Sequence, residues 1–96
     1  MTEQPSPRVR FELFTSAFCG SCHSARIVLA HAASVIPGAV VEEHDVAFDA
    51  ARAEAAEITS TPTVIVRDAA GEQVFRAEGA PSLEQVLRAA ALAIPD

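Results

Sequence analysis

Two cysteines stand three positions apart in the segment Cys19-Gly20-Ser21-Cys22, and they are the only cysteines of the chain. They follow an extended apolar run and stand where a helical pattern begins. Two thiols at this spacing can close a disulfide, because positions i and i+3 at the start of a helix lie on the same side. The free N–H groups and the positive end of the helix dipole stabilise a thiolate at the first cysteine. The pair therefore has the outline of a redox centre.

Disulfide exchange requires one exposed thiolate that attacks and a second thiol, nearer the helix interior, that resolves the mixed disulfide. Their order along the predicted helix assigns attack to Cys19 and resolution to Cys22, and makes these two the candidate catalytic residues. The alternative is a pair of unreactive helix cysteines.

Cofactor chemistry is the next alternative for this motif. The segment Cys19-Gly20-Ser21-Cys22-His23 also matches the attachment pattern of c-type haem, but Met1 is the only methionine and regular elements fill the chain. Zinc or an iron–sulfur cluster would need further ligands, and only His23, His31 and His44 are available, so a cluster would have to be shared between two subunits. We expect no metal and no cofactor beyond the Cys19–Cys22 disulfide, with the three histidines as solvated or satisfied polar residues.

Length and charge narrow the class of protein. The 96 residues suit one domain, which we place at residues 9–96 behind a flexible N-terminal tail at residues 1–8. The net charge is −6, and the seven basic residues, all arginines, are dispersed, which argues against a nucleic-acid partner. No apolar stretch indicates a signal peptide or a membrane span. We expect a cytoplasmic monomer, and in the reducing cytosol a cysteine pair is more often catalytic or metal-binding than structural.

Periodicity and turn signals predict seven elements around the motif. Strands are expected at residues 9–15, 39–46, 63–67 and 73–77, and helices at residues 19–35, from a cap at Asp49 to residue 57, and after the capping-box segment at residues 82–85. Gly71 can supply the positive φ that the loop between the last two strands needs. Apolar side chains should line one face of the first strand and of the two long helices: Val9, Phe11, Leu13; Cys22, Ala25, Leu29, Ala32, Ala33, Ile36; Leu83, Val86, Leu87, Ala90, Ile94.

The predicted order, βαβαββα, leads to an α/β fold. Right-handed crossovers give a mixed four-stranded sheet in which residues 39–46 form one edge, followed by 9–15, 63–67 and 73–77. Three helices flank this sheet on both faces.

With this order, the chain resembles the thioredoxin-like superfamily, as a minimal thioredoxin- or glutaredoxin-like protein, over nearly everything after residue 8. Cys19-Gly20-Ser21-Cys22 looks like the active-site motif, and Phe18 sits where the family carries an aromatic residue. Thr61-Pro62-Thr63 looks like the cis-proline loop that faces the dithiol, and Gly71 and Gly79 match the family's glycines.

The resemblance implies a dithiol–disulfide oxidoreductase that reduces or exchanges disulfides of proteins or small thiols, with a reductase or a low-molecular-weight thiol as electron donor. It also implies that the Thr61 backbone pairs with an extended substrate segment. The residues expected to bind substrate are Phe18, Gly20, Ser21, Thr61, Pro62 and Gly79. The rival interpretation is a redox-inert module that binds a partner strand in the Thr61–Pro62 groove, with incidental cysteines.

The chain also departs from the family near the motif. Leu13 stands where thioredoxins carry a buried Asp, and the extra N-terminal strand and helix of thioredoxins do not fit before Val9. Glu12 and Glu43 are candidate proton acceptors for Cys22 in place of that Asp, although exposed strand carboxylates are the simpler interpretation. Arg26, one turn beyond Cys22, is interpreted as solvating the helix, with the steering of an acidic partner as the alternative.

Overall fold

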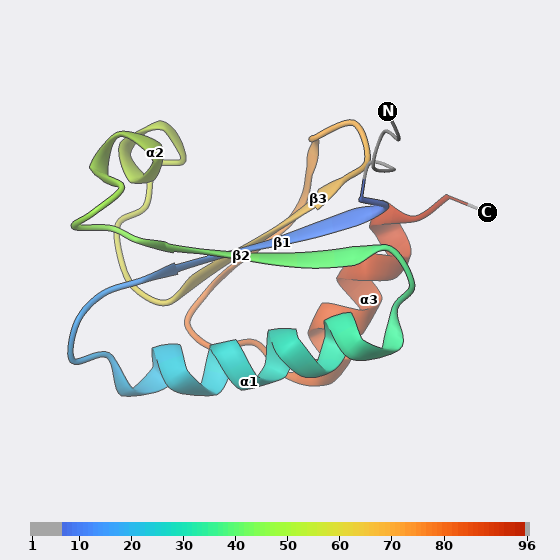
Figure 1. Cartoon of the computed structure of the whole chain (residues 1–96), viewed down its shortest axis with the longest axis horizontal. Helices are drawn as coiled ribbons and strands as arrows, with labels where there is room; N and C mark the ends of the chain where they lie inside the picture. Colours follow the sequence, from blue (N-terminus) through green and yellow to red (C-terminus); the bar gives the residue numbers. More distant parts are fainter. Residues whose placement is uncertain (1–6, 96) are drawn as a thin grey trace, which may run out of the picture.

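The structure, a computed structural model, describes residues 7–95 (Figure 1). Its elements follow the predicted order: β1 (Val9–Thr15), α1 (Gly20–Val35), β2 (Ala39–Asp45), α2 (Ala50–Ala55), β3 (Thr63–Asp68), β4 (Gln73–Glu78) and α3 (Leu83–Ala93). The first six residues of the expected N-terminal tail lie outside the described residues. Within residues 7–95, no helix combines the length and the hydrophobicity needed to span a lipid bilayer.

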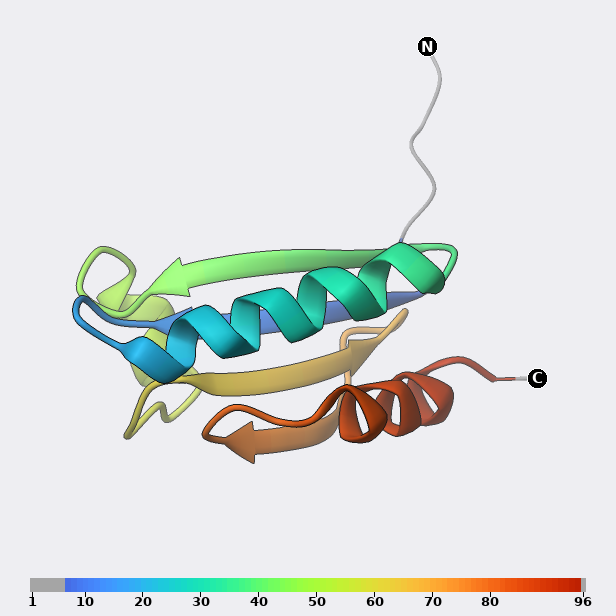
Figure 2. The same cartoon turned by 90° about the horizontal axis from the view of Figure 1, so that it is seen from below.

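The four strands form one mixed sheet in the predicted order β2-β1-β3-β4. β2 runs parallel to β1, whereas β3 is antiparallel to both β1 and β4. Helices α1 and α3 cover one face, with α1 over β1 and β2 and α3 over β3 and β4, and α2 lies on the opposite face at one end (Figures 1 and 2). β2 lies at the edge of the sheet, where even its apolar residues Val40 and Val41 are exposed. This position explains why the strand can contain many polar residues.

The main core fills the space between the sheet and helices α1 and α3. Strand side chains alternate between the faces, so Val9, Phe11 and Leu13 of β1 all point into this core and are fully buried. The predicted apolar faces are confirmed except at Leu87, which is 37% exposed. The buried stripe of α3 runs through Val86, Ala89, Ala90 and Ala93, and Leu87 lies one position to the side of it.

A smaller core lies under α2, where Phe14, Ala53 and Ile65 pack together. This helix ends at Ala55, not at residue 57 as predicted, because Glu57 adopts a left-handed φ of 55° that stops the helical path. Asp49 occupies the N-cap position as predicted, but its side chain makes no capping hydrogen bond. It accepts a hydrogen bond from Nε of Arg52 at 2.9 Å instead.

Local signals at the other ends of elements are confirmed. Ser82 caps α3 in a complete capping box, in which its side chain accepts from the N–H of Gln85 and its own N–H donates to the Gln85 side chain. Gly71 has a φ of 89° in the loop between β3 and β4, as predicted.

The end of β2 differs from the prediction. β2 stops at Asp45, one residue earlier than predicted, because the Asp45 side chain accepts the N–H of Ala47 and starts a turn.

Candidate redox site

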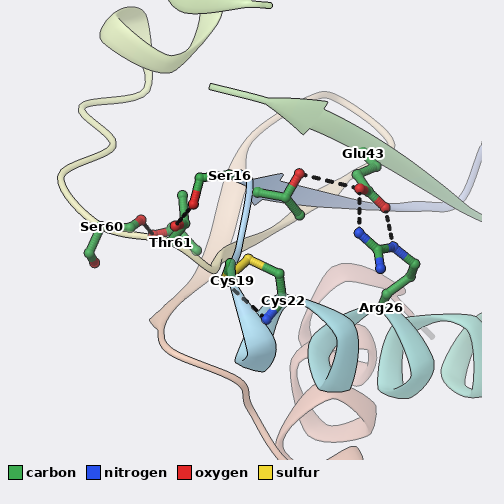
Figure 3. Close-up of a disulfide and its surroundings, with 9 residues drawn as sticks. Ser16, Cys19, Cys22, Arg26, Glu43, Ser60 and Thr61 are labelled. Atoms are coloured by element: carbon green, nitrogen blue, oxygen red, sulfur yellow. Dashed lines mark hydrogen bonds and ion pairs between the residues drawn. A yellow bond between two sulfur atoms is a disulfide. The ribbon is translucent and has the colours of Figure 1, made fainter. Parts of the chain in front are cut away.

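Cys19 and Cys22 form a disulfide at the start of α1, with their Cα atoms 5.2 Å apart (Figure 3). Cys19 is the N-cap of the helix, so the helix begins one residue later than predicted, and its sulfur accepts the backbone N–H of Cys22 at 3.1 Å. Cys19 is partly exposed, whereas Cys22 is only 2% exposed. One sulfur is thus accessible at the tip of the helix and the other lies beneath it.

The turn between β1 and α1 sets this position. Thr15 ends the central strand β1, and the chain reverses through Ala17 and Phe18 before the helix begins. Phe18 takes a left-handed φ of 59°, which is uncommon for a bulky residue, and its ring is fully exposed. The aromatic side chain next to Cys19 therefore contributes nothing to the core and is free for contact with another molecule.

A second loop closes on the segment that precedes Cys19. The hydroxyl groups of Ser16 and Thr61 are 2.6 Å apart and share a hydrogen bond, and Figure 3 shows both residues beside the disulfide. The Thr61–Pro62 peptide bond is cis. The N–H of Gly79 donates to the carbonyl of Pro62 at 2.8 Å, which ties the same loop to the end of β4.

The residues expected at the site thus gather at one end of the sheet. Phe18, Gly20 and Ser21 are exposed next to Cys19, Thr61 is partly exposed, and Pro62 is buried. Ser16 was not among the expected site residues, because its contact with Thr61 joins positions 45 apart in the chain.

A cavity of about 250 Å³ lies at this end of the sheet. It is lined by both hydroxyl and apolar side chains, from Ser16, Val46, Ile58, Thr59, Ser60 and Thr61. Of the residues expected to bind substrate, only Thr61 lines it, so the sequence missed most of this surface.

Leu13, which the resemblance places where thioredoxins carry a buried Asp, is fully buried. Glu43, in the neighbouring strand β2, is held by Arg26, which donates to it from both Nε and Nη2 at 2.7 Å, and by the Thr15 hydroxyl at 3.2 Å (Figure 3). The hydrogen bonds from Arg26 lower the pKa of Glu43 below its usual range, and the same contact raises the pKa of Arg26. A carboxylate of lowered pKa is a weak base, so Glu43 is poorly suited to accept a proton from Cys22. The sequence interpretation, in which Arg26 only solvates the helix, is therefore corrected: Arg26 is the ion-pair partner of Glu43.

The two interpretations of Glu12, an exposed carboxylate or a proton acceptor for Cys22, are also corrected by the structure. It is 5% exposed and points to the sheet face opposite Leu13, where Nε of Arg67 donates to it at 2.5 Å. The sheet therefore separates Glu12 from the cysteines, and it is neither an exposed carboxylate nor a proton acceptor for Cys22. His44 is also less accessible than expected: its side chain is 11% exposed and its ring packs on Phe14, with centroids 5.3 Å apart.

Comparison with known proteins gives a likeness in structure alone. No protein-family model and no curated protein sequence matches the chain. Among solved structures, a mutant thioredoxin from Halobacterium salinarum superposes with a TM-score of 0.83 at 23% identity, over 94% of this chain and 78% of that one. Thioredoxins from Schistosoma mansoni (TM-score 0.78, 22% identity, 93% and 82% covered) and Plasmodium falciparum (0.75, 24%, 91% and 83%) are also similar. Together with the sheet order and the position of the disulfide, these likenesses establish that the chain has the fold of the thioredoxin-like superfamily.

Proposed function

We propose that this protein is a dithiol–disulfide oxidoreductase that cycles Cys19 and Cys22 between dithiol and disulfide. The observation that carries the proposal is the arrangement of the two sulfur atoms: one is accessible at the N-cap of α1, and the other is buried directly behind it. A merely structural cross-link between residues this close in sequence would give little constraint on the unfolded chain.

The reaction proceeds in two exchange steps. In the reduced protein the Cys19 thiolate attacks one sulfur of a substrate disulfide, forms a mixed disulfide and releases the other substrate sulfur as a thiolate, which takes up a proton. Cys22 then loses its proton and attacks the sulfur of Cys19, which closes the intramolecular disulfide and releases the second substrate thiol. Two electrons and two protons pass to the substrate, and an external thiol or reductase restores the dithiol.

The Cys19 thiolate draws its stabilisation from the backbone. The N–H of Cys22 already points at the Cys19 sulfur, and a hydrogen bond to an ionised acceptor is stronger than one to a neutral acceptor. The helix dipole adds to this. The nearest arginine along the helix, Arg26, is engaged with Glu43 and is therefore not free to stabilise the thiolate.

The proposed substrate is a disulfide of a protein or of a small thiol. An extended segment beside Thr61 would bring its disulfide next to Cys19, and the exposed ring of Phe18 offers apolar contact on the same side. The cavity beside Thr61 provides room for a neighbouring substrate side chain.

Differential alkylation tests the roles of the two cysteines. The protein is fully reduced, treated briefly with iodoacetamide over a range of pH, and the labelled sites are counted by mass spectrometry. We expect Cys19 to be labelled first and at a lower pH than an ordinary thiol, whose pKa is about 8.5. Equal labelling of both residues, or labelling of Cys19 only at the pH of an ordinary thiol, would contradict the proposal.

Single-cysteine variants separate catalysis from binding. With a disulfide-bonded peptide as substrate, Cys22→Ser should accumulate a mixed disulfide through Cys19, whereas Cys19→Ser should form none and lose all turnover. Ser24→Ala, an exposed substitution in the same helix, is the matched control and should turn over like the wild type. Peptide binding that survives in Cys19→Ser, combined with no turnover by the wild type, would favour the redox-inert binding module.

A further inference from the structure

A second group of chemically capable side chains lies on the sheet face opposite the disulfide, next to α2. It consists of Glu12 on β1 and Glu42 and His44 on β2, called the Glu12–Glu42–His44 cluster below. We propose that this cluster binds a divalent transition-metal ion, with zinc as the best match to its ligands. The proposal is independent of the redox function, because the sheet separates the two places.

The spacing of the ligand atoms fits a metal ion. Nε2 of His44 lies 3.6 Å from Oε2 of Glu12 and 3.6 Å from Oε1 of Glu42, and the three atoms all lie within 4.8 Å of one another. In a tetrahedral zinc site with bonds of about 2.0–2.1 Å, neighbouring ligand atoms are about 3.4 Å apart. A small movement of the side chains would therefore complete three of the four ligands of such a site.

The ring of His44 gives a second observation in favour of a bound ion. Nε2 of His44 is buried and has no hydrogen-bond partner among residues 7–95. Buried polar nitrogens are nearly always paired, and this one points at two carboxylate oxygens that are too distant for a hydrogen bond. A metal ion between the three atoms would satisfy all of them at once.

The other nitrogen of His44 lies close to a carboxylate. Nδ1 lies 3.4 Å from Oδ2 of Asp49, and a carboxylate behind the second ring nitrogen fixes the orientation of a histidine ligand and raises its basicity. The His44 ring also packs against Phe14 at a tilt of 45°, which restricts the ring further. Nε2 is thus directed towards the carboxylates.

Two arginines orient the carboxylates from outside. Arg67 binds Oε1 of Glu12 at 2.5 Å and Arg10 binds Oε2 of Glu42 at 2.7 Å. Each arginine therefore takes one carboxylate oxygen and leaves the other facing His44. The arginines also compete with a cation for the negative charge, so we expect selectivity for ions that bind nitrogen ligands strongly over Mg²⁺ or Ca²⁺.

The cluster is open to small molecules. A cavity of about 380 Å³ lies on this side of the sheet, and Glu12, Glu42, Arg10 and Arg67 are among its lining residues. It gives an ion a route to the carboxylates and leaves room for a water molecule as the fourth ligand, as in zinc sites with three protein ligands.

Zinc titration of the full chain tests the proposal. Because a reduced Cys19–Cys22 pair would bind zinc itself, the protein is used with the disulfide intact and free thiols shown to be absent. Isothermal titration with ZnCl₂ should give one site. His44→Asn and Glu42→Gln should abolish it, Asp49→Asn should weaken it by about 10–100-fold as loss of an outer carboxylate does, and MgCl₂ should give no heat of binding.

His31→Asn is the matched control, because His31 is exposed on α1 at a distance from the cluster in the fold. It should bind zinc like the wild type, and circular dichroism of each variant should show an intact fold. No binding of ZnCl₂ by the folded wild type, or binding that persists in both His44→Asn and Glu42→Gln, would overturn the proposal and leave the cluster as an ion-pair network only.

Discussion

The ion pair between Glu12 and Arg67 lies within the sheet, and its removal should destabilise the protein measurably. In Arg67→Met the hydrophobic part of the side chain is kept, but Glu12, which is 5% exposed, loses the cation that accompanies its burial. The substitution also removes the hydrogen bond from Arg67 to the carbonyl of Gly71. The carboxylate would then be left with an uncompensated desolvation cost.

The size of the effect follows from the exposure of the two partners. Removal of one partner from a fully buried pair costs about 3–5 kcal/mol, whereas an exposed pair contributes at most about 1 kcal/mol. Because the Arg67 side chain is 27% exposed, we expect an intermediate loss of about 2–3 kcal/mol. In urea this lowers the unfolding midpoint by about 1–2 M.

The assay is urea unfolding at pH 7 in metal-free buffer, followed by far-ultraviolet circular dichroism. Arg88→Met is the matched control, because Arg88 pairs with Glu84 at 2.7 Å on the exposed surface of α3, and its loss should stay within about 0.5 kcal/mol. Replacing both partners, with Glu12→Gln in the Arg67→Met background, should recover part of the stability, since no unpaired charge remains. Equal losses in Arg67→Met and Arg88→Met would refute this reasoning.

Three further changes probe the core, a helix cap and a surface ion pair. Leu29→Ala, at a fully buried position between α1 and the sheet, should lower the free energy of unfolding by about 2–5 kcal/mol, measured by urea unfolding. Ser82→Ala removes the acceptor for the N–H of Gln85 and should cost about 1 kcal/mol in the same assay. Because the pKa of Glu43 is lowered in the folded protein, its ion pair with Arg26 stabilises above the unfolded value of about 4.3 and the benefit is lost as pH falls below it. Glu43→Gln should therefore be less stable than the wild type at pH 7, and the difference should shrink as the pH is lowered through the acid range; an unchanged difference would contradict this assignment.

The sequence alone determined the elements and the place of the cysteines within them. Alternating apolar residues define β1, the capping box at Ser82 starts α3, and Gly71 marks the loop between β3 and β4. The Cys19–Cys22 pair is identified for the same reason: spacing along a helix is a local property, set by residues within one or two turns. Right-handed crossover connections then gave the order of the strands.

The tertiary structure decided what surrounds each polar side chain. β1 lies between β2 and β3, so both of its edges are paired, and register brings Arg67 to Glu12 from 55 positions away. The same pairing sets Glu42 and His44 beside Glu12, and it moves Glu43 to Arg26 on the other face. No periodicity within one strand reports which strands lie beside it or in what register, because those contacts join distant parts of the chain. For that reason the Cys19–Cys22 pair could be found in the sequence, whereas the Glu12–Glu42–His44 cluster could be found only in the folded protein.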